Sequence, residues 1–330
     1  MRQAAPRFAF PLPGASSLRR KPSSRWTARP FRRGCISLIS TAPTPKLEDA
    51  TIDGVPADEW VHNRTIELIR QHVYVERAFE EQGLTIPEAE AASAQSTADQ
   101  YYDENEDLIA ANGIGKESYR TFYMSQVKYN ALLQAYLEEH RSEVTVDEAK
   151  EYMDTTYAHI MQLTLPSTDA SYQLLDEDAA AALMEAANNA IAQMEDEGAT
   201  LDEVADDVLQ EVLPLSGREY TDSSVSEYLS ERYVSENSTL YGNDFSLAML
   251  AAEVGSCGLY TASTSPLLYE KLPNYETDQQ FEEEHFAAMA DEINARAFEE
   301  EVDEKAGALS LEEDAAAVRT YSVYNIKTEV

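Results

Sequence analysis

The chain has 330 residues and carries 61 acidic against 25 basic residues, which gives a formal net charge of −36 at pH 7. This length allows a sizeable hydrophobic core, whereas the negative charge argues against nucleic acid as a partner, because its phosphates would be repelled. Two cysteines exclude a disulfide framework and a cysteine-rich metal site, and no apolar run reaches the 18 residues that a membrane-spanning helix needs.

Residues 1–46 differ in composition from the rest of the chain. They hold ten basic residues, no acidic residue and seven of the 13 prolines, which leaves 15 basic and 61 acidic residues for residues 47–330. The prolines break any helix longer than two turns, and no secretory signal is recognisable, because the apolar stretch after Arg7 is short and proline-broken. We expect a disordered basic tail with few contacts, whose origin as a start-site artefact, a genuine tail or a targeting segment stays open.

Hydrophobic periodicity predicts a helical domain over residues 47–145. Apolar residues recur at three- and four-residue steps over residues 58–82 and 116–140. A weaker helix is expected between them, from Pro87 to Gly113. Each of these helices has an apolar face that needs a partner elsewhere in the chain.

The pattern changes to mixed helix and strand over residues 146–275. Thr145 and Glu148 have the spacing of a capping box that opens a short helix. The next ten residues, 157–166, alternate in part and end at proline, which predicts a strand. Further helices are expected over residues 176–197, from Thr200 onward, around residues 225–233 and over residues 243–253, with short strands over residues 258–263 and 267–272.

The last segment, residues 276–330, returns to helix. An acidic amphipathic helix is expected over residues 277–305, followed by a short helix over residues 310–319 and a strand over residues 320–327. Neither helical segment alone can bury its apolar face, so we expect them to pack together. The predicted fold class is therefore α+β and mostly helical, with a small antiparallel-sheet domain inserted between helical segments.

Three stretches resemble PrsA/SurA-type foldases, in which a helical chaperone domain brackets a parvulin-type peptidyl-prolyl isomerase domain. Residues 53–86 resemble the N-terminal region of this group. Residues 144–165, VTVDEAKEYMDTTYAHIMQLTL, and residues 245–273, FSLAMLAAEVGSCGLYTASTSPLLYEKLP, resemble the beginning and the end of its parvulin domain. The resemblance covers residues 51–330 and implies a SurA-like chaperone domain around a parvulin-like domain.

The resemblance also implies a proline pocket, which acts by binding a twisted peptide in a desolvated site. His159 matches the first histidine of that pocket and is the candidate catalytic residue. Leu209 and Glu211 fall where the family has its Cys or Asp, and Leu267 replaces the second histidine. Because two of three polar positions are lost, we expect isomerase activity to be weak or absent. The residues expected to contact substrate are Met161, Leu163, Leu209 and Leu267.

Simpler roles compete with these assignments. His159 also fits a structural strand histidine that bonds its neighbours, and Cys257 fits a small buried filler better than a nucleophile. His62, His72 and His285 lack the spacing of a ligand pair, so we expect no metal and no cofactor.

The resulting hypothesis is an extracytoplasmic foldase that holds unfolded or proline-containing polypeptides, with weak or lost isomerase activity. Two alternatives stay open: an active isomerase that uses His159 with a partner outside the family pattern, and a non-catalytic structural or interaction protein of the cell envelope. An open apolar groove floored by Met161, Leu163 and Leu267 favours peptide binding, and a filled one favours the structural role. The resemblance also implies a lipid-anchored cysteine, for which residues 1–46 contain no recognisable signal.

Overall fold

The computed structural model divides the chain into residues 1–46 and residues 47–330. It describes residues 50–236, 238, 241–261, 265–314, 324, 326 and 327. The expected basic tail, residues 315–319 of the expected short helix and most of the expected terminal strand lie outside these residues. Residues 310–314 are described and are not helical, so a helix beginning at Ser310 is wrong.

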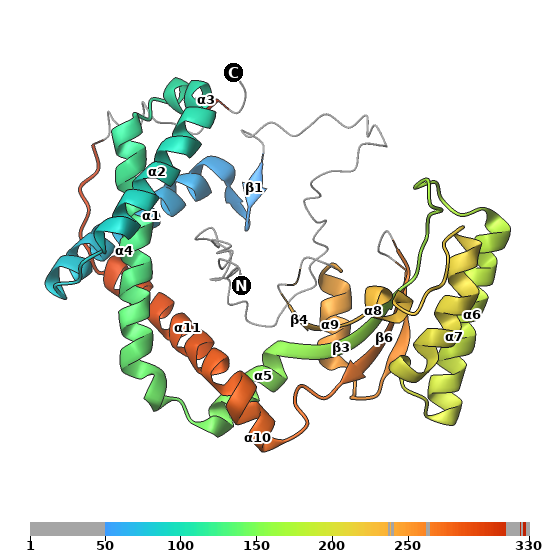
Figure 1. Cartoon of the computed structure of the whole chain (residues 1–330). Coiled ribbons are helices and arrows are strands. Elements are labelled where there is room, and N and C mark those ends of the chain that lie inside the picture. The colour runs from blue at the N-terminus through green and yellow to red at the C-terminus, as the bar shows by residue number, and fades with distance from the viewer. Residues whose placement is uncertain are drawn as a thin grey trace. The chain divides into compact units, whose positions relative to one another are not determined.

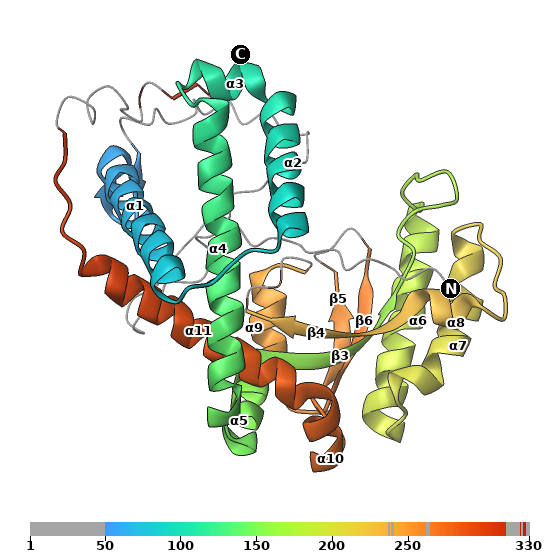
Figure 2. The ribbon, with the colours of Figure 1, turned by 60° about the vertical axis from the view of Figure 1, so that its left-hand side comes forward.

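The first helices pack around one long central helix, α4 (Lys116–His140). It contacts both α1 (Ala57–Glu81) and α2 (Glu88–Glu104), and it lies between them in Figure 2. The expected middle helix is divided at Asn105, whose side-chain amide donates a hydrogen bond to the Tyr101 carbonyl at 2.9 Å. Such a bond competes with helical backbone bonding, and a separate short helix, α3 (Glu106–Ala111), follows.

A short hairpin precedes α1 and was not predicted. Its strands are β1 (Thr51–Ile52) and β2 (Val55–Pro56). Asp53 and Gly54 connect them with φ angles of 53° and 80°. An Asp-Gly pair is the sequence signal for a tight hairpin turn, so this hairpin could have been predicted from the sequence.

The C-terminal helix α11 (Phe286–Gly307) contacts α1, α4 and α5 (Val146–Thr156). Its Phe298 ring lies 5.3 Å from the ring of Tyr129 and 5.3 Å from the ring of Tyr136, both on α4. Phe298 of the apolar stripe expected over residues 277–305 therefore has partners on both long N-terminal helices, whereas Phe281 and Met289 pack with Ala149 and Met153 of α5. We call α1 to α4 together with α11 the helical region.

The helix predicted over residues 277–305 is continuous from Asp278 to Gly307 and contains one π-helical turn near its start. It begins with α10 (Asp278–Gln280), where the Thr277 hydroxyl accepts a hydrogen bond from the Gln280 N–H at 3.1 Å. One π-helical turn, η3 (Phe281–His285), comes before α11. The other short link, the 3₁₀ helix η2 (Arg141–Glu143), joins α4 to α5.

Four antiparallel strands form the larger sheet in the order β4-β3-β6-β5. The two central strands are β3 (Tyr157–Thr164) and β6 (Leu267–Leu272), and the two outer ones are β4 (Leu229–Ser235) and β5 (Cys257–Tyr260). The helix predicted around residues 225–233 is wrong: only α8 (Ser224–Tyr228) is helical there. Residues 229–235 pair instead with β3, because cross-strand pairing outweighs local propensity.

Each face of the sheet carries a core, whereas Glu231, Arg232 and Tyr233 on the edge strand β4 stay exposed. On one face α6 (Glu177–Glu197) and α7 (Leu201–Leu215) form a core with Leu163 and Leu268, and Figure 1 shows these two helices side by side. On the other face α9 (Asn243–Ala251) covers Ile160 and Leu267. Because side chains alternate along a strand, His159, Met161 and Leu163 share the α6/α7 face. We call residues 157–272 the sheet region.

The predicted fold class is confirmed. The protein is mostly helical, and its small antiparallel sheet is inserted between the N-terminal helices and α11.

Gly258 on β5 is required by a close approach of Tyr269, its partner on β6. A Cβ atom at this position would lie 2.7 Å from the Tyr269 hydroxyl oxygen. The Tyr269 ring cannot retreat freely, because it packs edge-on against Phe245 at 5.4 Å. We expect Gly258→Ala to lower the free energy of unfolding by about 1–3 kcal/mol, as overpacking does. Urea unfolding checks this against Gly307→Ala, where a Cβ meets nothing within 4 Å; equal stability of the two variants would contradict it.

Candidate functional site

His159 lies on β3, opposite Tyr233 of β4 and Leu272 of β6. Its ring is fully engaged by neighbouring groups. The Nδ1 atom is 3.0 Å from the Pro273 carbonyl oxygen, and the Nε2 atom is 3.2 Å from the Glu231 carboxylate. One ring face stacks on Tyr233, with centroids 4.4 Å apart and planes inclined by 12°.

The turn after β6 holds this arrangement in place through Asn274. Its side-chain oxygen accepts a hydrogen bond from the His159 N–H at 3.0 Å, and its amide donates to the Tyr157 carbonyl at 3.1 Å. Its backbone carbonyl accepts from the Tyr233 hydroxyl at 2.8 Å. Burial raises the pKa of that hydroxyl, with Glu231 and Glu284 adding to the effect, so Tyr233 remains a donor.

His159 therefore has partners even though Leu267 replaces the second histidine of the family pattern. The structure supplies three groups that were not predicted: Glu231, Tyr233 and the Pro273 carbonyl. This geometry favours the alternative of a structural strand histidine that bonds its neighbours.

His285 approaches the same cluster from η3, with its ring 5.7 Å from the Tyr233 ring and inclined by 68°. Its Nε2 atom is buried and has no hydrogen-bond partner among the residues that the structure describes. The fold thus brings His159, Tyr233 and His285 together from positions far apart in the sequence. No spacing in the sequence indicates this, because the three residues belong to separate elements.

The four predicted substrate-contact residues do not line one surface. Leu163 and Leu209 are fully buried in the core beneath α6 and α7, and Met161 packs half-buried against that core. Leu267 lies in the opposite core, beside Phe245. Met161, Leu163 and Leu267 therefore do not form the floor of one open groove.

The pairing of β3 with β6 explains this separation. Leu267 lies opposite Thr164, so its side chain points away from the sheet face that carries His159. The residue directly opposite His159 is Leu272, which the comparison with the family pattern did not indicate. The proposal that Leu267 stands in the place of a histidine facing His159 therefore does not fit the observed register.

Cys257 lies half-buried at the edge strand β5 and packs against the α6/α7 core. Burial raises the pKa of its thiol, and the nearby carboxylates of Glu195 and Glu270 raise it further. A thiol attacks as its thiolate, so this environment opposes a nucleophilic role. The buried-filler interpretation is the one that these contacts favour.

The three remaining histidines have separate partners. The Nδ1 atom of His140 is 3.0 Å from the Glu143 carboxylate. The Nε2 atom of His62 is 3.4 Å from the Glu313 carboxylate, and the Nδ1 atom of His72 is 2.7 Å from the Ser125 hydroxyl. Across the described part of the chain, no group of three or more His, Cys, Asp or Glu side chains is arranged to hold a metal ion.

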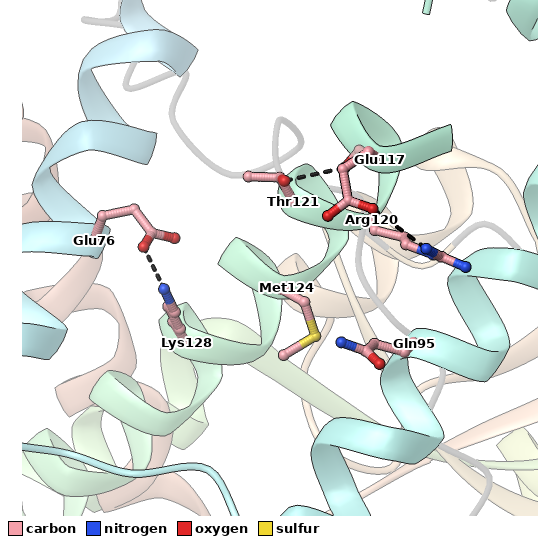
Figure 3. Close-up of a pocket in the computed structure, with 7 residues that line it drawn as sticks. All are labelled: Glu76, Gln95, Glu117, Arg120, Thr121, Met124 and Lys128. Carbon is pink, nitrogen blue, oxygen red and sulfur yellow. Dashed lines mark hydrogen bonds and ion pairs between the residues drawn. The ribbon is translucent and has the colours of Figure 1, made fainter. Parts of the chain in front are cut away.

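A second candidate site is a pocket of about 260 Å³ in the helical region. It lies over α4, with α1 on one side and α2 on the other (Figure 3). Lys128 and Glu76 form an ion pair at one wall, and Arg120 donates to Glu117 at 3.2 Å at another. Met124 projects between them. The lining residues are Glu76, Gln95, Glu117, Arg120, Thr121, Met124 and Lys128.

Arg120 also fastens α2 to α4. Its Nε and Nη2 atoms donate to the two carboxylate oxygens of Asp99 at 2.5 and 2.7 Å. Lys116, one turn earlier on α4, donates to Asp103 at 2.6 Å. The two basic side chains of the pocket, Arg120 and Lys128, are thus both committed to carboxylates of the protein itself.

Acidification should weaken the contact between α2 and α4. The hydrogen bond from Arg120 lowers the pKa of the Asp99 carboxyl below its ordinary value. Because this pKa is lower in the folded state, the stabilisation is present above the unfolded-state value of about 3.9 and is lost as the pH falls through the folded-state value. We expect the thermal midpoint of the wild type to fall more steeply below about pH 4 than that of Asp99→Asn. Parallel pH curves would contradict this role.

No protein-family model and no curated protein sequence matches the chain. Solved structures do match. Foldase protein PrsA from Streptococcus pneumoniae is 14% identical, with 82% of this chain and 98% of that chain covered and a TM-score of 0.38. PrsA from Bacillus subtilis is 14% identical, with 82% and 96% covered and a TM-score of 0.30. The peptidylprolyl isomerase PrsA from Bacillus anthracis is 13% identical, with 76% and 100% covered and a TM-score of 0.28. These structures belong to the foldase group that the sequence resembles.

Among the helices that the structure describes, none combines the length and the apolar composition needed to cross a membrane.

Proposed function

We propose that the chain is a foldase of the chaperone type, which holds unfolded polypeptides and has little or no prolyl isomerase activity. The observation that carries this proposal is the environment of His159. Its two ring nitrogens face oxygen atoms of Pro273 and Glu231, and one ring face is covered by Tyr233. A histidine occupied in this way is not available to tune hydrogen bonds around a twisted substrate amide.

Three of the residues expected to line an apolar proline pocket are core residues of the sheet region. Leu163 and Leu209 are fully buried, and Leu267 is only 3% exposed. Catalysis of isomerisation requires a site that binds the twisted amide better than the planar one. Filled core positions do not offer such a site.

Binding of unfolded chains is assigned to the helical region instead. Three large side chains there remain substantially exposed: Ile69 at 43%, Tyr101 at 53% and Phe122 at 53%. These side chains offer apolar contacts to segments of other chains, as do Tyr172 and Leu174 of the sheet region, which are 86% and 80% exposed. The excess of acidic residues keeps a complex with an unfolded polypeptide in solution. The extracytoplasmic location is part of the proposal and rests on the resemblance to the foldase group.

A second candidate is a non-catalytic structural or interaction protein of the cell envelope. The burial of Leu163, Leu209 and Leu267 favours this candidate, because a structural protein does not need a groove that binds unfolded polypeptides. An active isomerase remains the third candidate, and it would require His159 to leave Glu231 and Pro273 when substrate binds.

An aggregation-suppression assay with a chemically unfolded model protein separates the first two candidates. We expect the intact chain to suppress aggregation near equimolar ratio, because the helical region offers exposed apolar side chains. His159→Ala should suppress it equally well. The double variant Tyr101→Ala/Phe122→Ala should suppress it less. Absence of suppression by the wild type would reject holding and leave the structural role.

A further inference from the structure

The segment that contains Lys327 is bound to the helical region through its backbone. The Lys327 N–H donates to Oδ1 of Asn112 at 2.8 Å, and Nδ2 of Asn112 donates to the Lys327 carbonyl at 3.0 Å. An N–H and a C=O of one residue that reach the same partner have the arrangement of paired antiparallel strands. The Asn112 carboxamide therefore takes the place that a peptide group of a neighbouring strand would have.

The helical region holds the Asn112 carboxamide in a fixed orientation. Asn112 follows α3, and its Nδ2 atom donates a second hydrogen bond to the Leu108 carbonyl at 2.9 Å. The turn after it is fixed as well, because the Tyr102 hydroxyl donates to the Ile114 carbonyl at 3.1 Å. This turn lies at one end of the helical region, where α3 connects α2 to α4 (Figure 2). The donor and the acceptor that meet Lys327 are thus preorganised by contacts that do not involve Lys327.

The two described residues at this contact bury little apolar surface. The Lys327 side chain is exposed, and Ile326 is 54% exposed. On the helical region, Ile114 lies two residues after Asn112 and is 44% exposed. A polypeptide that bonds Asn112 and also covers Ile114 would gain apolar contacts that the protein's own segment leaves exposed.

We propose that Asn112 binds the extended backbone of an unfolded polypeptide, and that Lys327 occupies this site until such a client displaces it. The contact with Lys327 indicates the chemistry of the occupant, because Asn112 bonds one backbone N–H and one backbone C=O. Every residue except proline carries both groups, so the site does not depend on the charge or size of the client's side chains. This inference rests on the proposed holding function and specifies which part of the client is bound.

Competition with Lys327 lowers the apparent affinity for a client. A site that is open in only a fraction of the molecules binds its ligand more weakly by that fraction. One hydrogen bond of this kind changes an equilibrium constant about fivefold. Loss of the bond that the Lys327 N–H donates should therefore open the site and strengthen client binding.

Two substitutions at Lys327 in the full chain test this competition. Lys327→Pro removes the backbone N–H, whereas Lys327→Ala keeps it and removes only the exposed side chain. Fluorescence anisotropy measures the binding of a labelled, unstructured peptide that contains apolar residues and no proline. We expect Lys327→Pro to bind this peptide about three- to fivefold more tightly than the wild type, and Lys327→Ala to bind it within about twofold of the wild type.

Asn112→Ala in the Lys327→Pro chain identifies the site of this gain. We expect the added substitution to return the affinity to the wild-type level or below it. Asn105→Ala is the matched control, because the Asn105 amide also donates to the carbonyl four residues earlier, that of Tyr101, at 2.9 Å. This control should leave the gain unchanged, and thermal unfolding verifies that each variant folds.

A chemically modified peptide tests whether the client's backbone is the bound group. The same peptide with N-methyl groups on its backbone nitrogens keeps its side chains and lacks the N–H donors. We expect it to bind the Lys327→Pro chain no more tightly than the wild type.

The outcomes separate this site from the holding function. Equal affinity of the wild type and Lys327→Pro overturns the site and leaves holding intact. An equal gain in Lys327→Ala, a gain that persists with Asn112→Ala or a gain that persists with the N-methylated peptide does the same. Failure of both the wild type and Lys327→Pro to bind the peptide overturns the site and the holding function together.

Discussion

Replacing Phe298 with alanine is expected to lower the free energy of unfolding by about 3–5 kcal/mol, the usual cost of removing a buried phenylalanine. The side chain is 5% exposed and belongs to a core shared by α1, α4 and α11, with Val75, Phe79 and Leu132 among its members. Its contacts with the rings of Tyr129 and Tyr136 are lost as well. This core is where the C-terminal helix joins the N-terminal helices, so its loss weakens the whole helical region.

Urea unfolding followed by circular dichroism measures the effect. Phe122→Ala is the matched control, because it removes the same side chain from an exposed position on α4. We expect the control to change stability by less than about 0.5 kcal/mol. Similar losses in both variants would mean that α11 does not close the helical region through Phe298.

Leu209→Ala is expected to destabilise the protein by about 2–5 kcal/mol and to leave peptide binding by the folded protein unchanged. Leu209 is fully buried between α7 and the sheet, in the core that also contains Leu163, Leu183 and Leu268. The position was predicted from the family pattern to contact substrate. In the structure the side chain packs in the core. A core role predicts that Leu209→Ala lowers stability, whereas a substrate contact predicts that it weakens peptide binding.

Leu174→Ala provides the control for this prediction, since Leu174 is 80% exposed in the loop after β3. Its stability should match that of the wild type within about 0.5 kcal/mol. A Leu209→Ala variant that kept wild-type stability and bound peptide more weakly would restore the predicted substrate contact.

Elements with strong local signals were predicted well from the sequence. Thr145 with Glu148 forms the expected capping box, and Thr200 with Glu203 forms a second one at the start of the helix expected from Thr200 onward, each with both reciprocal hydrogen bonds. Asp176 caps α6 through the Ala179 N–H at 2.8 Å. In each case the signal lies within four residues, so no knowledge of the tertiary structure is needed.

The site could not be predicted because its contacts are not local. The strand β4 has a weak pattern of its own and forms by pairing with β3, so Glu231 and Tyr233 had no visible link to His159. Leu267 was assigned by matching a motif, whereas its face is decided by the register with Thr164. A shift of one residue reverses the face of every side chain on a strand. The pocket over α4 combines side chains of α1, α2 and α4. Hydrophobic periodicity in the sequence does not indicate which faces of these helices lie next to each other.

The most direct test of the account is the rate of cis–trans isomerisation of an unstructured proline-containing peptide in the presence of the full chain. The account predicts the uncatalysed rate, with a time constant of tens of seconds or longer at 25 °C, and the same rate with His159→Ala. A rate well above background that His159→Ala abolishes would contradict it, because His159 would then leave its bonds to Glu231 and Pro273 and act on the substrate.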